Sequence, residues 1–165
     1  MANTRKPTAS LLPLLPRIFF LYLEPVIIPC GMVMAYSTRL PALAAGPPYD
    51  VAVLSGPGLS ATYLLCMLVY GLLILLSSPP NPALLKRHIA LLTLADVVHW
   101  LVILSTLSEA EAAATGQDPA GLWSHLHPSK WYHDENARML MLGPLLMFCV
   151  KIATLTGLFG RIGDA

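Results

Sequence analysis

Residues 88–107 read HIALLTLADVVHWLVILSTL, a run of twenty residues that is mostly apolar. A helix that crosses a membrane needs about 20 mostly apolar residues, because each residue rises about 1.5 Å through a hydrocarbon core about 30 Å thick. The stretch has this length, and Asp96 is its only acidic residue. It therefore predicts a membrane-spanning helix with an acid in its interior.

Three further stretches meet the same criterion. They are residues 17–36 (RIFFLYLEPVIIPCGMVMAY), 60–77 (SATYLLCMLVYGLLILLS) and 139–159 (MLMLGPLLMFCVKIATLTGLF). Pro25 and Pro29 are expected to kink the first of them, and Pro144 to lie in the first turn of the last. We therefore expect an all-α fold, an integral membrane four-helix bundle that forms one membrane domain over residues 1–165.

The composition argues against several classes of protein. Of the 165 residues, 56% are hydrophobic and 12% are charged, which is about half the charged fraction of an ordinary soluble domain. Ten basic and nine acidic residues give a net charge of +1, whereas a nucleic-acid binder needs an excess of Lys and Arg. A soluble enzyme, a disordered tail and a nucleic-acid partner are disfavoured, and membrane lipid is the expected environment.

The distribution of Lys and Arg predicts the orientation, since basic residues favour the cytoplasmic side of a membrane. The N-terminal segment, the second loop and the C-terminus share one side of a four-span chain, and they carry Arg5, Lys6, Arg17, Lys86, Arg87 and Arg161. On the opposite side, basic residues are mixed with a larger number of acids. Both termini are therefore expected in the cytoplasm, with the endoplasmic reticulum as the default compartment.

Four ionisable residues interrupt the spans, and each should face the bundle interior and find a partner, because charge is costly in hydrocarbon. Counted from the cytoplasmic ends of the spans, Glu24, Asp96 and Lys151 lie about 10–12 Å deep, and Tyr70 lies at the same level. His99 lies one turn deeper than Asp96 on the same helix face. The sequence thus predicts one polar layer to which all four helices contribute.

Two interpretations of this layer stay open. In the first, it is a packing device that sets the register of the helices. In the second, it performs acid–base chemistry, because Glu24, Asp96 and Lys151 sum to one negative charge when ionised and one acid is then expected to hold a proton. Either acid would be the catalytic proton donor to an apolar substrate, with His99 as the shuttle partner and Lys151 as the charge balance.

Four aromatic side chains can line a substrate-binding site together with Lys151, since their π faces stabilise a carbocation. They are Tyr22, Tyr63, Tyr70 and Trp100. Ordinary packing and anchoring at the membrane interface are the alternatives for these residues.

The segment between the third and fourth spans begins with a helix-prone run at residues 108–114 and then contains Trp123, Trp131 and Tyr132. Tryptophan and tyrosine are enriched at the membrane–water boundary, so we expect a loop that re-enters the interface, with a lid over the bundle as the alternative. Its histidines and acids match no zinc or di-iron spacing, and no metal or other cofactor is expected.

Three segments together resemble one protein family. They are residues 17–25 (RIFFLYLEP), residues 86–99 (KRHIALLTLADVVH) and a C-terminal part with Trp131, Asn136 and TGLFG at 156–160. They are similar to small four-span fungal membrane proteins that are catalogued only as a domain of unknown function and are sometimes associated with secondary-metabolite gene clusters. The resemblance implies that Glu24, Asp96 and His99 are motif residues, whereas Lys151 has no counterpart in it.

The layout is more distantly similar to the emopamil-binding and sigma-2 receptor group. In that group intramembrane acids surround a sterol-like ligand, and some members isomerise a ring double bond. The leading hypothesis is therefore a cyclase, an isomerase or a binding protein for an apolar terpenoid, sterol or polyketide in fungal secondary-metabolite biosynthesis. The alternative is a non-catalytic membrane scaffold or accessory protein whose polar layer only specifies packing. No oligomeric state is predicted.

Overall fold

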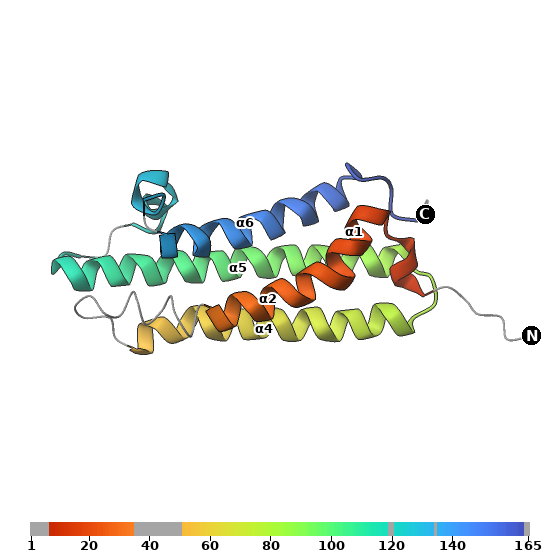
Figure 1. Ribbon diagram of the computed structural model, residues 1–165, viewed down its shortest axis with the longest axis horizontal. Coiled ribbons are helices and arrows are strands. Elements are labelled where there is room, and N and C mark those ends of the chain that lie inside the picture. The colour runs from red at the N-terminus through yellow and green to blue at the C-terminus, as the bar shows by residue number, and fades with distance from the viewer. Residues whose placement is uncertain (1–6, 35–50, 119–120, 134, 164–165) are drawn as a thin grey trace, which may run out of the picture.

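The computed structural model describes residues 7–34, 51–118, 121–133 and 135–163 (Figure 1). Its α-helices are α1 (Leu14–Ile18), α2 (Glu24–Met34), α4 (Val51–Ser77), α5 (Pro82–Thr115) and α6 (Glu135–Leu155). Shorter elements are the 3-10 helices η1 (Thr8–Leu11), η4 (Leu122–Leu126) and η5 (Pro128–Lys130) and the π-helical turn η2 (Phe19–Leu23). These ranges contain no strand, so the all-α prediction is confirmed.

The N-terminal helix is continuous from α1 through η2 to α2, and its distortion lies just before Pro25. The backbone N–H of Glu24 donates to the carbonyl of Phe19, five residues earlier, so the helix is widened at this point. A proline ring clashes with the carbonyl of the preceding turn and has no N–H to offer it, which favours such a local widening. Glu24 therefore sits at the junction between the π-helical turn and α2. The last two residues of the predicted span, 35 and 36, lie outside the described ranges.

Helix α5 is longer than the predicted span at 88–107, because both of its ends are capped beyond it. The side chain of Asn81 accepts a hydrogen bond from the N–H of Leu84 at 3.0 Å, and Pro82 occupies the first helical position. At the other end Gly116 adopts φ of 67° and its N–H donates to the carbonyl of Ala112. The helix-prone run at residues 108–114 is thus the continuation of α5.

Helix α6 begins and ends about four residues earlier than the span predicted at 139–159. It ends at Leu155 because Gly157 adopts φ of 80°, and the N–H groups of Gly157 and Leu158 turn back to the carbonyls of Thr154 and Ala153. This pattern is the Schellman motif that commonly ends helices. Pro144 lies inside α6, so its predicted place in the first turn is wrong.

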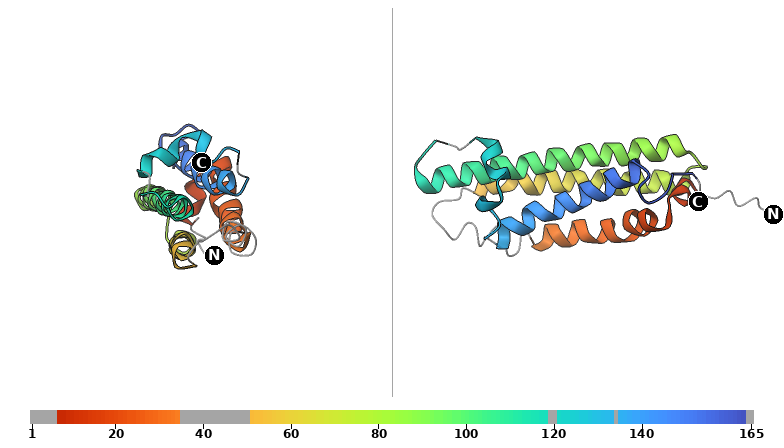
Figure 2. Two further views of the ribbon diagram at one scale, coloured as in Figure 1. Left: turned by 90° about the vertical axis from the view of Figure 1, so that its left-hand side faces the viewer. Right: turned by 90° about the horizontal axis from the view of Figure 1, so that it is seen from above.

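The helical segments run side by side along the molecule, with α4 beside α5, α5 beside α6 and α2 beside α4 (Figure 1 and Figure 2). Both ends of the described chain meet at one end of the molecule. There the N–H of Gly163 donates to the carbonyl of Leu11 at 3.0 Å, and the N–H of Thr8 donates to the carbonyl of Ser78 at 3.1 Å.

Buried apolar side chains occupy three clusters along the length of the bundle. At the end that holds the termini they are Ala9, Leu12, Phe20, Leu75, Leu85, Ile89 and Ile162, in the middle Leu64, Leu68 and Leu92, and at the far end Ile103, Leu104 and Met141. The site described below includes three charged residues that are as deeply buried as these apolar side chains.

Within the described ranges, two helices are long and apolar enough to cross a membrane, over Gly58–Ser77 and Pro82–Glu109. They match the predicted second and third spans. The apolar part of α6, Met141–Leu155, is shorter.

Candidate functional site

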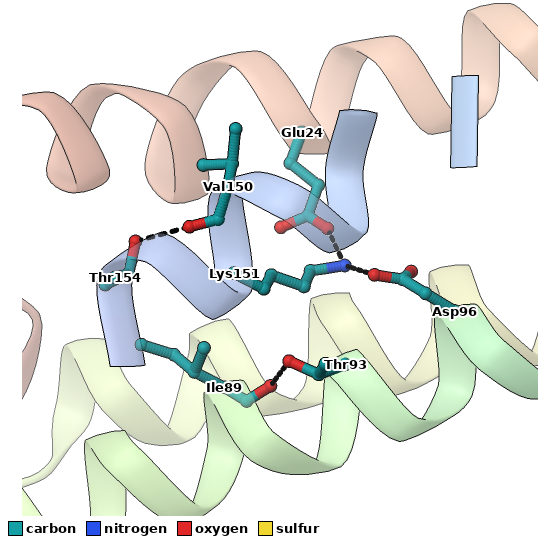
Figure 3. Close-up of polar contacts among 7 residues, drawn as sticks. All are labelled: Glu24, Ile89, Thr93, Asp96, Val150, Lys151 and Thr154. Atoms are coloured by element: carbon teal, nitrogen blue, oxygen red, sulfur yellow. Dashed lines mark hydrogen bonds and ion pairs between the residues drawn. The ribbon is translucent and has the colours of Figure 1, made fainter. Parts of the chain in front are cut away.

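Lys151 connects three helices through its ammonium group (Figure 3). From α6, its Nζ atom lies 2.5 Å from Oε1 of Glu24 on α2 and 2.7 Å from Oδ2 of Asp96 on α5. The three residues that were predicted to share one depth are therefore in direct contact. We call Glu24, Asp96 and Lys151 the triad.

The triad is enclosed by protein. Glu24 and Lys151 are 0% exposed and Asp96 is 2% exposed. Charges at such depth are tolerated only when they are paired and hydrogen-bonded, and Lys151 supplies that pairing to both acids. One atom is left over, since Oε2 of Glu24 is buried and has no hydrogen-bond partner among the described residues.

Two buried hydroxyls lie beside the triad, but their protons are directed elsewhere (Figure 3). Thr93 donates to the carbonyl of Ile89, and Thr154 donates to the carbonyl of Val150, each at 2.8 Å within its own helix. A hydroxyl has only one proton to donate. Neither threonine is therefore a donor to the carboxylates in this arrangement.

The fourth helix does not complete the polar layer in the predicted way. Tyr70, expected at the level of the triad, is 68% exposed, and Tyr22 and Tyr63 are similarly exposed at 65% and 64%. Their side chains lie on the outside of the bundle, so the layer comes from three helices and not from four. Trp100 packs against the cluster of Ile103, Leu104 and Met141, with its indole Nε1 buried and without a partner among the described residues.

His99 is directed to α4, where its Nδ1 atom lies 2.7 Å from the hydroxyl oxygen of Ser60. It was predicted to be the shuttle partner of Asp96. The described contacts place it instead in the interface between α4 and α5.

A second histidine in that interface was missed by the sequence analysis. The imidazole of His88 lies against Gly71 on α4, in the space that a Cβ atom at position 71 would occupy. His88 and His99 are eleven positions apart, as are Ser60 and Gly71. This equal spacing of two histidines on one helix and two small residues on the next was the signal in the sequence that could have indicated the two contacts.

The segment after α5 folds back onto the bundle. Nε2 of His125 lies 3.3 Å from Oε2 of Glu111, and Leu126 and Trp131 pack against the far apolar cluster. Trp123 and Tyr132 are exposed, as interfacial side chains would be. Among the described residues, no three His, Cys, Asp or Glu side chains gather as a metal site would require.

No family model, curated protein or solved structure matches this chain.

What the triad can do follows from its own charges and distances. Lys151 and one carboxylate cancel in charge, and the second acid is left either as a buried anion or as a proton-bearing carboxyl. The first role open to such a group is to hold helices together, and the second is to give or take a proton.

Proposed function

We propose that the chain is a multi-pass membrane protein in which α1 with α2, α4, α5 and α6 each cross the bilayer. We further propose that it is a non-catalytic scaffold or accessory protein whose triad fixes the register of three helices. The observation that carries this proposal is the direct contact of Lys151 with both buried acids. A site built for a substrate would leave room between these groups, whereas here the ammonium occupies it.

The outer surface supports the membrane placement. Large apolar side chains are exposed on all four helical segments, including Val26, Leu73, Leu94 and Leu146. An apolar surface of this extent is a liability in water, but it is the expected surface in hydrocarbon. In the Pro82–Glu109 span, Asp96 meets its partner inside the bundle, as intramembrane acids do.

Basic residues support one orientation. Arg17, Lys86, Arg87 and Arg161 belong to the segments that meet at the end of the bundle that holds both termini. Because cytoplasmic loops are enriched in Lys and Arg, we place this end in the cytoplasm. The endoplasmic reticulum is the working compartment, and membership of the fungal four-span family is part of the same proposal.

The triad suits a register device because its energy depends steeply on position. A slip of α6 by one helical turn would move Lys151 by about 5.4 Å and leave two acids and an ammonium buried without partners. Leaving a buried charge unpaired is strongly destabilising, whereas a paired one contributes little net stability. Such a triad selects one packing arrangement over its neighbours.

One observation favours a second candidate function. The unpartnered Oε2 atom of Glu24 is where a carboxyl proton would reside, and such a proton is what acid–base catalysis on an apolar terpenoid, sterol or polyketide requires. In this candidate Glu24 is the donor, and the protein is a cyclase, an isomerase or a binding protein.

Removing all three charges at once tests the choice. In the triple variant Glu24→Gln, Asp96→Asn and Lys151→Met, volume is kept and no charge remains unpaired. We expect this variant to insert, to fold and to restore the metabolite profile of host cells that lack the wild-type gene. The matched control carries Lys86→Met and Glu109→Gln, which change exposed charges in the same helix.

A folded triple variant with a lost product would contradict the scaffold role and support the acid–base role. A triple variant that inserts but does not fold would also contradict the scaffold proposal. In that proposal the three charges only neutralise one another, so removing all of them should still allow the helices to pack. The control pair separates either result from a general effect of altered charge.

A further inference from the structure

We infer that Glu24 holds a bound proton in the folded protein, so that the triad is a binding site for one proton. The ligand is a proton, and the atom that binds it is Oε2 of Glu24. This inference rests on the proposed membrane placement and on the triad geometry, but not on the scaffold role.

The charges of the triad do not balance when all three groups are ionised. Two carboxylates and one ammonium leave one negative charge among side chains that are essentially unexposed. A low-dielectric interior strongly disfavours a net buried charge, and a group in that position takes up a proton instead. One proton bound to one of the two acids makes the triad neutral.

The contacts distinguish the two acids. Asp96 accepts a hydrogen bond from Lys151 at 2.7 Å, and neither of its carboxylate oxygens is among the buried atoms that lack a hydrogen-bond partner. Glu24 touches the same ammonium through Oε1 only, and its Oε2 has no donor among the described residues. An ionised Glu24 would bury a charged acceptor at Oε2 without a donor. A protonated Glu24 would bury a neutral hydroxyl there, which also lacks a partner among the described residues but costs far less than a charge.

The neighbouring hydroxyls cannot supply the missing donor. Thr93 and Thr154 both donate to backbone carbonyls of their own helices. Both of these hydroxyl protons are therefore engaged, and neither is available to stabilise a second anion.

Other titratable groups on the packed helices do not replace this proton. His88 on α5 lies against Gly71, and its buried Nε2 has no partner among the described residues, so an imidazolium there would bury a positive charge on an N–H without an acceptor. His99 is engaged with Ser60. Arg17 on α1 donates to the carbonyls of Ser10 and Leu12 at the end of the bundle. On α4, the titratable side chains of Tyr63, Cys66 and Tyr70 are all exposed.

Infrared spectroscopy tests the inference on the full chain in phosphatidylcholine vesicles at neutral pH. We expect a carbonyl stretch of a protonated carboxylic acid that shifts when glutamate carries ¹³C in its carboxyl group and does not shift with labelled aspartate. The band should disappear in Glu24→Gln and persist in Glu109→Gln, which alters an exposed acid near the end of the same span as Asp96. Absence of the band, or a shift with labelled aspartate, would overturn the inference.

A comparison of two variants gives a second reading. Gln is the uncharged isostere of a protonated Glu, so Glu24→Gln should unfold at nearly the wild-type temperature. Asp96→Asn removes the anion that pairs with Lys151 and should unfold at a clearly lower temperature. If Glu24→Gln loses as much stability as Asp96→Asn, Glu24 is ionised and the inference fails. Neither result decides the scaffold role, which depends on the product formed by the triple variant.

Discussion

Nζ of Lys151 lies 2.7 Å from Oδ2 of Asp96, although 55 positions separate the two residues in the sequence. The contact joins α6 to α5, and the approach of Glu24 to the same ammonium extends the junction to α2. Because both acids depend on this one cation, the stability of the three-helix junction is concentrated in a single side chain. Substitutions at Lys151 and at the other interhelical contacts should therefore change the stability of the bundle by different amounts.

Lys151→Met should be the most damaging single change in the junction. It leaves two buried acids without a cation, and breaking a buried pair costs about 3–5 kcal/mol. The free energy of unfolding in bicelles measures the loss. Lys86→Met, at an exposed lysine of α5, should change it by less than about 0.5 kcal/mol. Equal effects of the two substitutions would contradict the junction.

Gly71→Ala should destabilise the interface between α4 and α5. The added Cβ would overlap the imidazole of His88, and overpacking typically costs about 1–3 kcal/mol. His88→Ala in the same chain should restore most of this loss, since it removes the overlapping ring. Gly143→Ala is the control, because nothing lies near its added Cβ and alanine favours the helix. Additive effects of the changes at positions 71 and 88 would speak against this contact.

Ser60→Ala should weaken the same interface through His99. The lost hydrogen bond, 2.7 Å long, is worth about 0.5–1.5 kcal/mol, and the ¹⁵N resonance of His99 Nδ1 should move. Ser77→Ala removes an exposed hydroxyl that donates to carbonyls of its own helix, and it should leave that resonance in place. An unchanged His99 resonance in Ser60→Ala would contradict the contact.

His125→Ala should release the segment that covers the far end of the bundle. Its contact with Glu111 would be lost, and Trp131 should become more accessible to a fluorescence quencher. The measurement is made in a Trp100→Phe, Trp123→Phe background, because Trp123 is already exposed and Trp100 packs against the same apolar cluster as Trp131. His127→Ala, at an exposed histidine of the same segment, is the control. Equal quenching in the two variants would show that His125 does not hold the segment in place.

The depth of the triad could be predicted because depth depends on residue count alone. Glu24, Asp96 and Lys151 lie at similar distances from the ends of their spans, and a constant rise per residue places them at one level. Costly charges in an apolar environment then have few other partners. The same logic yields the helices at 60–77 and 88–107, which the structure contains.

Rotation about the helix axis could not be predicted in the same way. On α4, the buried row of Leu64, Leu68 and Leu75 and the exposed row of Tyr63 and Tyr70 are both largely apolar. Hydrophobic periodicity tells an inner face from an outer one only when the outer face is polar. The sequence therefore placed Tyr70 in the interior polar layer, whereas its side chain is exposed.

The position at which α6 ends and the contact of His88 with Gly71 were not predicted either, because both depend on backbone conformation. Helix α6 ends where Gly157 adopts a left-handed conformation. Residues 156–160 (TGLFG) are largely apolar, so hydropathy alone assigned them to the span. His88 follows Lys86 and Arg87 at the start of the predicted span, where a polar residue needs no buried partner. Only the close approach of α4 at Gly71 places its ring in the interior.

Solid-state NMR on the protein in lipid bilayers tests the triad most directly, through dipolar couplings between ¹⁵Nζ of lysine and ¹³C carboxyl carbons. The chain contains four lysines, at positions 6, 86, 130 and 151. The triad predicts that one lysine nitrogen couples at once to an aspartate and a glutamate carboxyl carbon. Both couplings should vanish in Lys151→Met and remain in Lys86→Met. A spectrum without a lysine coupled to both kinds of acid would contradict the three-helix junction.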